Sequence, residues 1–421
     1  MHDLPVAIIG GGLTGLTCAL RLAEHGKDVH LFEAAPELGG RTKSFYDKQI
    51  NGWVDNGPHL LIGAYEATQR LLNDVGASDH VTWQPSLELP LWDESRGNFS
   101  LTPKPWLPFP VALLLSLTQM PGHGFQSMQG MLRIAREMKK PSERDVASWL
   151  TGMGIAPRLQ ADMIEPLCLG AMNTPMDQAD AETFARVLRE AFANHKSARL
   201  GWFNQPLSQA LIEPLGRTLK KLGCSIFNST TIRSIDQHED HSVLHGSGLN
   251  STAYAATVIA LPAYARNRLL GIKDTVQSES ITNVHLWFDD AVSLPQPLIG
   301  TVGTYSQWFF DVSAQLNENR HAHICAVISA ESPIDRNHTL HQVMDELGRV
   351  LKIELPEPVH SRIICEQRAT VLTNDTNQRF SDGTLLDASE SPRPGELPAT
   401  IESAVLRGEE AAKTLCSQAS S

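Results

Sequence analysis

Closely spaced cysteines and an excess of basic residues are both absent from this chain. The nearest two of its six cysteines are Cys325 and Cys365, so there is no CxxC pair for a metal or for thiol redox chemistry. Such dispersed thiols are typical of the reduced, buried cysteines of a cytosolic protein. Its 35 lysines and arginines are outnumbered by 47 aspartates and glutamates, which gives a formal net charge of −12. That balance excludes a general nucleic-acid binder, which needs a positive surface to replace phosphate counterions.

Long apolar runs are missing too, and no stretch offers the roughly eighteen uninterrupted apolar residues of a membrane-spanning helix. The first twelve residues contain no basic region and reach glycine early, which argues against a secretory signal. With 42% hydrophobic and 19% charged residues the composition is globular, and 421 residues predict two domains or one large composite unit. We therefore expect a cytoplasmic protein.

Signals for metal binding and for nucleophilic catalysis are weak or lacking. His321 and His323 have strand spacing, but no motif pairs a carboxylate or a cysteine with them. Neither a phosphate-binding P-loop nor a serine nucleophile elbow is present. We predict no metal site.

The first forty residues carry a βαβ nucleotide-binding pattern. An apolar run at 6–9 predicts a buried parallel strand, and Gly10, Gly12 and Gly15 follow it as G-x-G-x-x-G. Apolar residues at helical spacing come next, then a second strand at 29–32 that closes on Glu33. Gly10 allows the tight turn, Gly12 lets the backbone approach a diphosphate, and Gly15 lets helix and strand pack closely. This pattern predicts a dinucleotide on the helix N-terminus.

Two features decide which dinucleotide is expected. Glu33 can accept hydrogen bonds from ribose hydroxyls and would repel the 2′-phosphate of NADP. The residues after it end in Gly39-Gly40-Arg41, and this E-x(5)-G-G-R segment resembles that of the flavin amine oxidase and phytoene desaturase superfamily. The resemblance implies FAD, with a second backbone loop and an arginine near the diphosphate.

Three further blocks make the resemblance more specific. They are DNGPHLLIGAY at 55–65, EPLCLGAMNTP at 165–175 and LPATIESAVLRG at 397–408. Together they are similar to the squalene-associated FAD-dependent desaturases, whose activity is hydroxysqualene dehydroxylase, and the similarity runs from residue 6 to residue 412. The resemblance implies an α/β fold, with a Rossmann-like FAD-binding domain built from discontinuous segments and an α+β substrate domain.

The implied reaction belongs to the making of squalene for hopanoids. A hydroxylated C30 isoprenoid would lose its oxygen as water, and a hydride from reduced flavin would replace it. Departure as water is easier when an acid protonates the oxygen, and an adjacent alkene stabilises the allylic cation. The protein would supply position and a dry pocket. The electron donor is not identified by the sequence.

Candidate catalytic and substrate residues follow from the same blocks. His59, in the block that the family places near the isoalloxazine ring, is either the proton donor or orienting group or a structural histidine bonded to a loop carbonyl. Asp55 is a second candidate, although D-N-G also makes an Asx turn. Asn173 and Thr174 either line the substrate cavity or end a helix. The cofactor-binding candidates are Gly10, Gly12, Leu13, Thr14, Gly15, Glu33, Gly39, Gly40, Arg41, Gly57, Pro58, His59, Ile232, Glu390, Leu397, Ala399 and Thr400.

One segment departs from the superfamily, which usually carries an A-G-D-W-like segment before the final helix. Its aspartate and the helix N-terminus hold the ribityl and diphosphate part of FAD. Residues 388–391 correspond to it, with Ser389 for the glycine, Glu390 for the aspartate and Ser391 for the tryptophan. The longer Glu390 can still accept a bond from a hydroxyl, whereas Ser389 crowds the cofactor. We expect an effect on FAD affinity and none on the fold.

Domain boundaries are expected to alternate along the chain. The FAD-binding domain is assembled from residues 1–85, 206–265 and 360–421, and the substrate domain from residues 86–205 and 266–359.

Residues 103–140 form a possible membrane-docking part. Residues 105–132 contain no charged side chain, and Arg133, Arg136, Lys139 and Lys140 follow on a predicted helix. An apolar segment beside a basic helix suits peripheral docking on an anionic bilayer, here the inner face of the cell membrane. The alternative is a buried core segment beside a solvated helix.

Other functions remain open. A carotenoid-type isoprenoid desaturase would share the fold and flavin and run hydride transfer the other way. A non-catalytic isoprenoid-binding protein that has lost flavin would explain the altered 388–391 segment. An amine oxidase is disfavoured because that group presents two aromatic rings before the flavin, and Phe380 is the single aromatic residue after Phe310.

Overall fold

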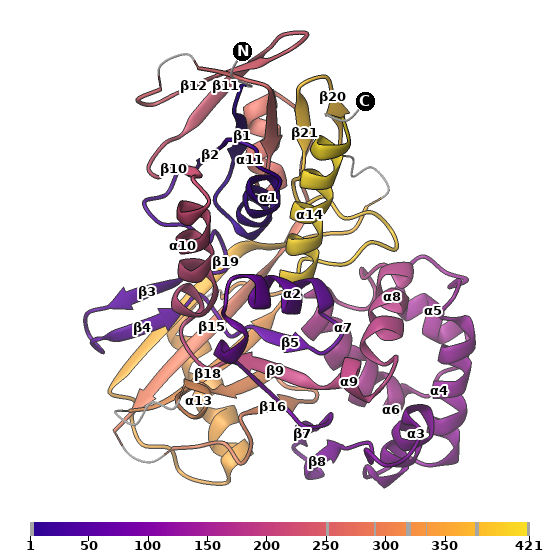
Figure 1. Ribbon diagram of the computed structural model, residues 1–421. Helices are drawn as coiled ribbons and strands as arrows, with labels where there is room; N and C mark the ends of the chain where they lie inside the picture. Colours follow the sequence, from indigo (N-terminus) through magenta and orange to yellow (C-terminus); the bar gives the residue numbers. More distant parts are fainter. Residues whose placement is uncertain are drawn as a thin grey trace.

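The apolar strands around the first glycine turn build a parallel sheet. The computed structural model describes residues 4–249, 252–289, 292–316, 321–333, 335–374 and 379–418. Within them, β1 (Val6–Ile9) lies between β2 (Val29–Phe32) and β14 (Ala256–Ile259) in a six-stranded sheet, at the top of Figure 1. The sheet has the order β10-β2-β1-β14-β21-β20, with β10 (Ser225–Phe227), β21 (Leu385–Asp387) and the antiparallel edge strand β20 (Ser381–Asp382). These strands come from three separate parts of the chain.

Helices cover this sheet closely. The crossover between β1 and β2 is α1 (Leu13–Glu24), and α14 (Ile401–Gln418) packs against it. A Cβ atom at Gly408 of α14 would lie 2.5 Å from the carbonyl oxygen of Thr14, so only glycine permits this approach. Other elements of this part are α2 (Glu66–Asp74), α10 (Glu213–Lys221), α11 (Ala263–Leu270) and a three-stranded sheet of β11 (Ile232–Gln237), β12 (Ser242–Gly246) and β13 (Thr252–Tyr254). The predicted Rossmann-like α/β fold is confirmed.

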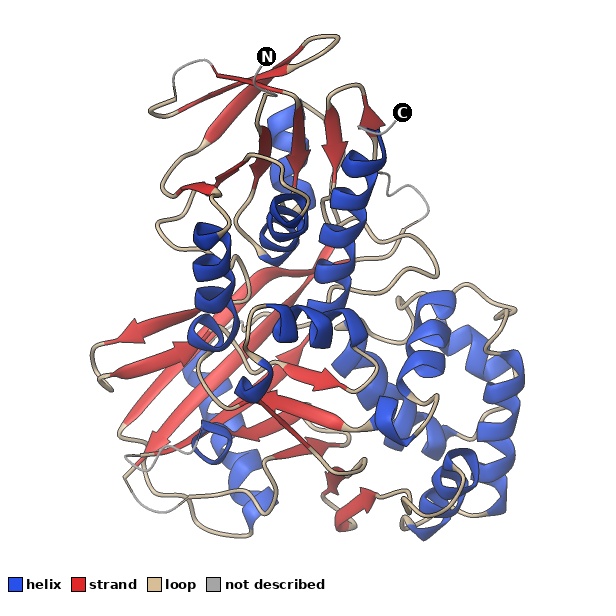
Figure 2. Ribbon diagram, in the orientation of Figure 1, coloured by secondary structure: helices blue, strands red, loops and turns tan. Residues whose placement is uncertain are grey.

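A larger, mostly antiparallel sheet lies below the first one (Figures 1 and 2). Its order is β19-β15-β18-β17-β16-β7-β8, formed by β19 (His360–Val371), β15 (Ser278–Phe288), β18 (Ala322–Ser329), β17 (Trp308–Asp311), β16 (Leu298–Thr301), β7 (Leu89–Asp93) and β8 (Gly97–Leu101). One face packs on α13 (Arg336–Leu351) through Val284, Leu286 and Val343. Strand β19 pairs in this sheet although residues 360–421 are assigned above to the FAD-binding domain. The domain boundaries stay predictions.

Smaller elements connect the two large sheets. A hairpin of β3 (Ser44–Asp47) and β4 (Gly52–Asp55) precedes the 55–65 block. A second small sheet has the order β5-β9-β6, from β5 (Leu60–Ile62), β9 (Leu200–Phe203) and β6 (Val81–Trp83). Short helical turns lie at Ser78–His80, Gln160–Ile164, Ser208–Ile212 and α12 (Val312–Leu316).

A helical lobe projects from the side of the larger sheet (Figure 2). It contains α3 (Phe109–Gln119), α4 (Phe125–Glu137), α5 (Val146–Gly152), α6 (Pro157–Leu159), α7 (Glu165–Met172), α8 (Ala181–Ala191) and α9 (His195–Ala198). Pro108 and Pro110 stand at the start of α3, where proline is tolerated because the first helical amides have no intrahelical partner. Helix α4 ends at Glu137, so Lys139 and Lys140 follow the helix, contrary to the expectation that they belong to it.

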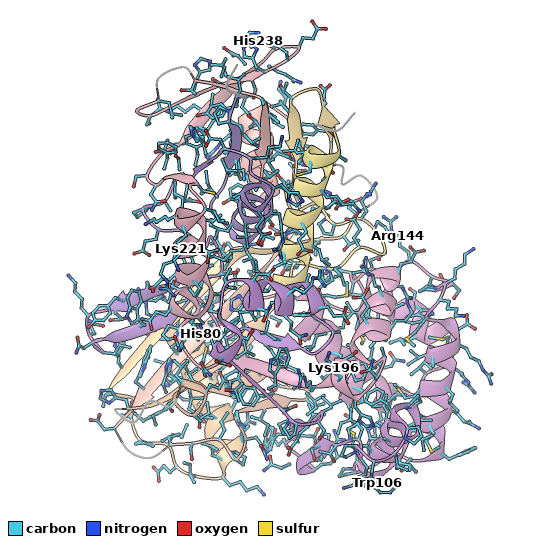
Figure 3. The ribbon with its side chains drawn as sticks, in the orientation of Figure 1. His80, Trp106, Arg144, Lys196, Lys221 and His238 are labelled. Carbon is cyan, nitrogen blue, oxygen red and sulfur yellow. The ribbon has the colours of Figure 1, made fainter. Side chains whose placement is uncertain are left out.

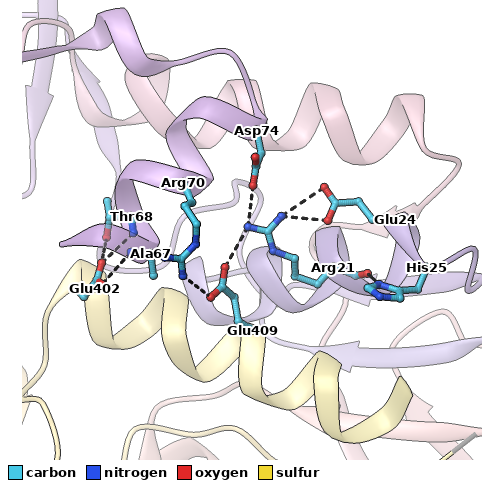
Figure 4. A network of polar contacts seen from close by, with 9 residues as sticks. All are labelled: Arg21, Glu24, His25, Ala67, Thr68, Arg70, Asp74, Glu402 and Glu409. Atoms are coloured by element: carbon cyan, nitrogen blue, oxygen red, sulfur yellow. Dashed lines mark hydrogen bonds and ion pairs between the residues drawn. The ribbon is translucent and has the colours of Figure 1, made fainter. Parts of the chain in front are cut away.

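Charged side chains on α14 join it to α1 and α2 (Figure 4). The Glu402 carboxylate is buried and accepts bonds from the Ala67 and Thr68 amides at 2.9 and 2.8 Å and from the Thr68 hydroxyl at 2.6 Å. It therefore satisfies the free amides at the start of α2. Glu409, nearer the surface, pairs with Arg21 at 3.0 Å and with Arg70 at 3.1 Å. These contacts fix the position of α14 along its own axis relative to α1 and the glycine turn.

Glu402→Ala is expected to lower the free energy of unfolding by about 3 kcal/mol or more, because three buried donors lose their acceptor. Glu409→Ala is the matched control on the same helix, and its partly exposed ion pairs are worth about 1 kcal/mol or less. The measurement is the urea midpoint of both variants against the wild type. Equal midpoints for the two variants would contradict this account of the α2 N-terminus.

Candidate active site

The three glycines of the first motif, which we call the glycine cradle, meet three different environments. Gly10 has φ +115°, and a Cβ atom there would lie 2.4 Å from the Ala260 carbonyl oxygen. A Cβ atom at Gly15 would lie 2.0 Å from the Gly10 carbonyl oxygen. A Cβ atom at Gly12 would have no described atom within 4 Å. Gly10 and Gly15 are therefore required by packing, whereas Gly12 borders open space.

That space lies at the N-terminus of α1, where the first amides have no partner within the helix. No side chain caps the helix at Gly12 and its first turn has no acidic residue, while Leu13 and Thr14 are buried there. At the end of β2, the Glu33 carboxylate accepts bonds from the Gly11 and Ala35 amides, both at 2.7 Å. Free helix amides attract anions, and a carboxylate beside them can hold sugar hydroxyls. The arrangement fits a dinucleotide.

The second glycine loop, Gly39-Gly40, is hydrogen-bonded to the first. The Gly39 amide donates to the Gly11 carbonyl at 2.8 Å, and Gly39 and Gly40 have φ angles of +114° and +60° that favour glycine. Arg41 follows and forms an ion pair with Glu390. Two glycine loops thus meet beside the open space at Gly12, and the Arg41 guanidinium follows the second of them in the chain.

The 388–391 segment, which departs from the superfamily pattern, is joined to Arg41 by this ion pair. It is buried, and the Ala388 amide donates to the Ile259 carbonyl at 2.9 Å at the end of β14. Burial raises the pKa of the Glu390 carboxyl, but Arg41 and Arg407 together hold it below its usual value. The Ser389 hydroxyl donates to the Ile259 carbonyl at 3.3 Å. Glu390 is therefore an ionised partner of Arg41, and its correspondence to the superfamily aspartate stays a prediction.

The remaining cofactor candidates lie in two places, just before α14 and at the start of β11. Thr400 caps α14, since its hydroxyl accepts from the Ser403 amide at 3.1 Å while the Ser403 hydroxyl accepts from the Thr400 amide at 3.0 Å. Leu397 and Ala399 lie in the loop before that cap. Ile232 begins β11 and packs in one apolar cluster with Phe32. Their contacts with FAD stay predictions.

A pocket lies where the 55–59 loop faces the larger sheet. Its polar lining comes from Asp55, His59, His285, His323 and Gln315. Its apolar lining comes from Trp53, Pro58, Phe203, Leu207, Val312 and Leu316. Gly57 permits the close approach of the loop, because a Cβ atom there would lie 2.5 Å from the Asn283 amide nitrogen on β15. The pocket is apolar with a few converging polar groups, as small-molecule sites usually are.

His59 is oriented by its own loop. Its Nδ1 donates to the Gly57 carbonyl at 2.9 Å, so the neutral ring leaves Nε2 as an acceptor. Burial lowers the pKa of the imidazole, the bond to Gly57 raises it, and the charge of Arg41 lowers it again, so the net shift is downward. The predicted structural bond to a loop carbonyl is present, and the other nitrogen remains for chemistry.

Asp55 lines the same pocket but is held by neighbouring groups. One of its oxygens accepts from the Ser44 hydroxyl at 2.6 Å and from the Leu207 amide at 3.0 Å. These bonds join β3, β4 and the turn before α10. Its catalytic role stays a prediction.

Asn173 and Thr174 lie away from this pocket. Asn173 ends α7 with φ +49°, and its buried amide bonds to the Ser280 carbonyl at 3.0 Å and the Ala330 amide at 2.9 Å. The Thr174 hydroxyl donates to the Met172 carbonyl at 2.9 Å. These contacts suit the helix-ending alternative, and a substrate role for either residue stays a prediction.

Sequence reasoning missed the imidazole pair formed by His285 and His323. The stretches at 281–288 and 322–329 are typical of sheet strands, but no motif in the sequence indicates which of their side chains meet. The antiparallel register of β15 and β18 brings the two rings together. His321 instead bonds to Asp289 at 2.9 Å. In the part of the chain that the structure describes, no group of three His, Cys, Asp or Glu residues could hold a metal ion.

The chain is similar to several known proteins. A family model described as flavin containing amine oxidoreductase matches residues 13–373. The chain is 26% identical over 435 residues to a hydroxysqualene dehydroxylase of Zymomonas mobilis, covering 96% of this chain and 97% of that one. It is 24% identical over 427 residues to a hydroxysqualene dehydroxylase of Sinorhizobium fredii, covering 98% of each. It is also 23% identical over 310 residues to a 15-cis-phytoene desaturase of Synechococcus elongatus, covering 68% of this chain and 65% of that one.

Solved structures share the fold. An oxidoreductase from Methanosarcina mazei has a TM-score of 0.76 at 14% identity, covering 97% of this chain and 100% of that chain. A putrescine oxidase bound to putrescine has a TM-score of 0.70 at 14% identity, covering 99% of each. At this identity the likeness establishes the fold alone. Across the described ranges, no helix is both long and apolar enough to cross a bilayer.

Proposed function

The chain belongs to the flavin-containing amine oxidoreductases, and we propose that it removes the hydroxyl group of hydroxysqualene to give squalene. It is a flavin-dependent oxidoreductase, and FAD is its cofactor. The proposed reaction would supply squalene for hopanoids. It rests on full-length similarity to two hydroxysqualene dehydroxylases, together with a pocket that sets histidines among apolar walls.

The residues that would hold FAD come from the two glycine loops and from the side chains beside them. The amides after Gly12 and the Arg41 guanidinium suit the diphosphate, and Glu33 suits the adenosine ribose. Glu390 can take the part of the superfamily aspartate, provided that it keeps its charge beside Arg41. Reduced FAD supplies the hydride that replaces the departing oxygen.

The side chains of this protein would handle the oxygen and exclude water. Trp53, Phe203 and Leu207 make a dry wall, which preserves a reactive cation long enough for hydride capture. The C–O bond breaks with its electron pair leaving on oxygen, which departs as water after it receives a proton. We assign that proton to His59 Nε2 in the imidazolium form, which is a stronger acid than free histidine because its pKa is lowered.

The main alternative is an isoprenoid desaturase, which the phytoene desaturase relative keeps open. The histidines that line the pocket favour the dehydroxylase, because a hydrocarbon has no group with which to satisfy them. A carrier without flavin is disfavoured by the intact glycine cradle. The yellow colour and flavin spectrum of the purified protein would eliminate it.

The test of the function is anaerobic incubation of photoreduced protein with hydroxysqualene, followed by product identification. Squalene and reoxidised flavin in equal amounts are expected. A desaturated product from squalene with oxidised flavin, and no squalene from hydroxysqualene, would establish the alternative.

His59→Ala is expected to lower kcat/KM for hydroxysqualene about 100-fold or more while FAD content stays unchanged, because a positioned acid contributes about that much. In the wild type, kcat/KM is expected to rise roughly tenfold per unit as the pH falls from about 8 to about 7, since the protonated fraction of His59 grows. The His59→Ala variant should lose this dependence of kcat/KM on pH. Unchanged turnover in His59→Ala would return His59 to a purely structural role.

We also propose that the α3–α4 hairpin contacts an anionic bilayer at the cytoplasmic face of the cell membrane. Two large aromatic side chains are strongly exposed there, Trp106 at 77% and Phe125 at 72%, and Figure 3 shows Trp106 at the outer edge of the helical lobe. Leu115 and Leu132 are also exposed. The cations Arg133, Arg136, Lys139 and Lys140 are exposed nearby along the chain, which complements anionic headgroups.

Replacing both Trp106 and Phe125 by serine is expected to weaken binding to anionic phospholipid vesicles about tenfold or more, because each ring contributes roughly 1.5–3 kcal/mol on burial. Val359→Ser, at a side chain exposed to 50% elsewhere, is the control. Vesicle sedimentation measures the bound fraction. If the double variant and the wild type sediment equally, the hairpin is not the docking site.

A further inference from the structure

The imidazole pair is buried in the protein yet opens on the pocket. His285 lies on β15 and His323 on β18, and His285 Nδ1 is 3.0 Å from His323 Nε2. Their exposed fractions are 1% and 3%, and both line the pocket together with His59. Trp287 stacks on the His323 ring, with centroids 4.3 Å apart and planes at 24°. The His323 ring is thus held in one orientation at the pocket wall.

The positions of the hydrogens on the Cys325 thiol and on the His285 and His323 rings can be assigned from their pKa shifts and contacts. Burial raises the pKa of the Cys325 thiol, which therefore keeps its hydrogen, and its Sγ lies 3.7 Å from His285 Nε2. Burial also lowers the pKa of both imidazoles, so each ring is neutral and carries one N–H. The same Sγ also lies 3.7 Å from the Ala326 carbonyl oxygen. If the thiol donates to His285 rather than to that carbonyl, then His285 Nδ1–H donates to His323 Nε2. The hydrogen of His323 is then on Nδ1, for which the described residues provide no hydrogen-bond partner.

An acceptor lines the same pocket. The bond from His59 Nδ1 to Gly57 leaves His59 Nε2 with a free lone pair in the neutral ring. The pocket therefore combines one N–H donor and one nitrogen acceptor among apolar side chains. An alcohol can satisfy both groups at once, because its oxygen accepts and its hydrogen donates, whereas a hydrocarbon satisfies neither.

We propose that this pocket binds the hydroxyl group of an isoprenoid alcohol, with His323 Nδ1–H donating to the alcohol oxygen and the neutral His59 Nε2 accepting from its hydrogen. In the proposed reaction the same Nε2 donates its proton only after it has become protonated. His285 is a positioning residue that fixes the tautomer of His323. The inference deepens the proposed function and rests on it. It makes His323 the residue that distinguishes hydroxysqualene from squalene, and it favours release of the product, which has lost the group that the pocket recognises.

The test is a binding measurement on the oxidised holoprotein, which cannot turn over. Hydroxysqualene and squalene are titrated separately in mixed detergent micelles, and the shift of the flavin absorbance reports occupancy. The wild type is expected to prefer the alcohol about tenfold or more, because a site that hydrogen-bonds a hydroxyl rejects the analogue lacking it. His323→Phe should reduce the preference to near unity, whereas His323→Gln, which keeps an N–H donor, should retain most of it.

His321→Phe is the matched control, since it makes the same change two residues away and outside the pocket. Equal affinities of the wild type for the two lipids would overturn the proposal, and this result does not depend on how any variant folds. A flavin-loaded His323→Phe variant that prefers hydroxysqualene over squalene as strongly as the wild type does would also overturn the proposal.

The two proposals fail separately. If the wild type prefers the alcohol but makes no squalene in the photoreduction experiment, the reaction is wrong and the hydroxyl site stands. If the wild type makes squalene and shows no preference, the reaction stands and the site is wrong.

Discussion

Gly12→Val is expected to give a folded protein without flavin. A Cβ atom at Gly12 meets no described atom within 4 Å, so a larger side chain costs little in the packing of the chain. The space that it fills lies over the unpaired amides of α1, where the diphosphate of FAD would bind. Two valine methyl groups there exclude the phosphates and also shield the amides that attract them. The expected effect is complete loss of bound FAD.

The measurement is the absorbance spectrum of the purified variant, with circular dichroism to establish that it has folded. Gly152→Val is the control, because a Cβ atom at Gly152 also meets no described atom within 4 Å but lies in the helical lobe. Gly15→Val should instead fail to fold, since its Cβ atom would lie 2.0 Å from the Gly10 carbonyl oxygen. A Gly12→Val protein with full flavin content would show that the diphosphate binds elsewhere.

Lowering the pH from about 7 to about 5 is expected to reduce the free energy of unfolding by roughly 4 kcal/mol through the imidazole pair. Burial and the charge of Arg362 lower the pKa of His285 to about 3, and burial and His285 lower that of His323. In the unfolded chain both rings take up protons near their ordinary pKa of about 6.5. The unfolded state then binds more protons than the folded state, so stability falls as the pH falls below that value.

Urea unfolding of the wild type at the two pH values measures this effect. The double variant His285→Gln, His323→Gln removes both titrating groups, and its midpoint should depend much less on pH over this range. The carboxylates are common to both proteins, so the difference between the two pH dependences isolates the imidazole pair. Equal pH dependences would mean that the two rings titrate in the folded protein at their ordinary pKa, as they do in the unfolded chain.

The glycine motif shows how much of the fold could be predicted from one continuous stretch of sequence. An apolar strand, three glycines, a helix and Glu33 lie within one continuous stretch, so their mutual geometry follows from short connections and from the steric demands of glycine. The stretch at 281–288 is likewise typical of a strand, and β15 runs from Ser278 to Phe288. The FAD assignment rested on the Gly39-Gly40-Arg41 segment and the superfamily that it resembles.

Contacts between distant residues could not be predicted in this way. Arg41 and Glu390 are 349 positions apart, and no local pattern relates them. The imidazole pair depends on the register of β15 against β18, because a shift of one residue would turn one ring to the opposite face of the sheet. Glu402 reaches the start of α2 only because α14 packs beside α1.

The sequence by itself determined the nucleotide-binding unit and the family of this protein, because strand, turn and helix signals are local and the motifs that carry the family resemblance are short continuous stretches. The tertiary structure alone decided which polar side chains face the pocket. That choice depends on strand register and on helix packing, which join residues far apart in the chain, and the donor and acceptor proposed to recognise an alcohol exist only once those elements have come together.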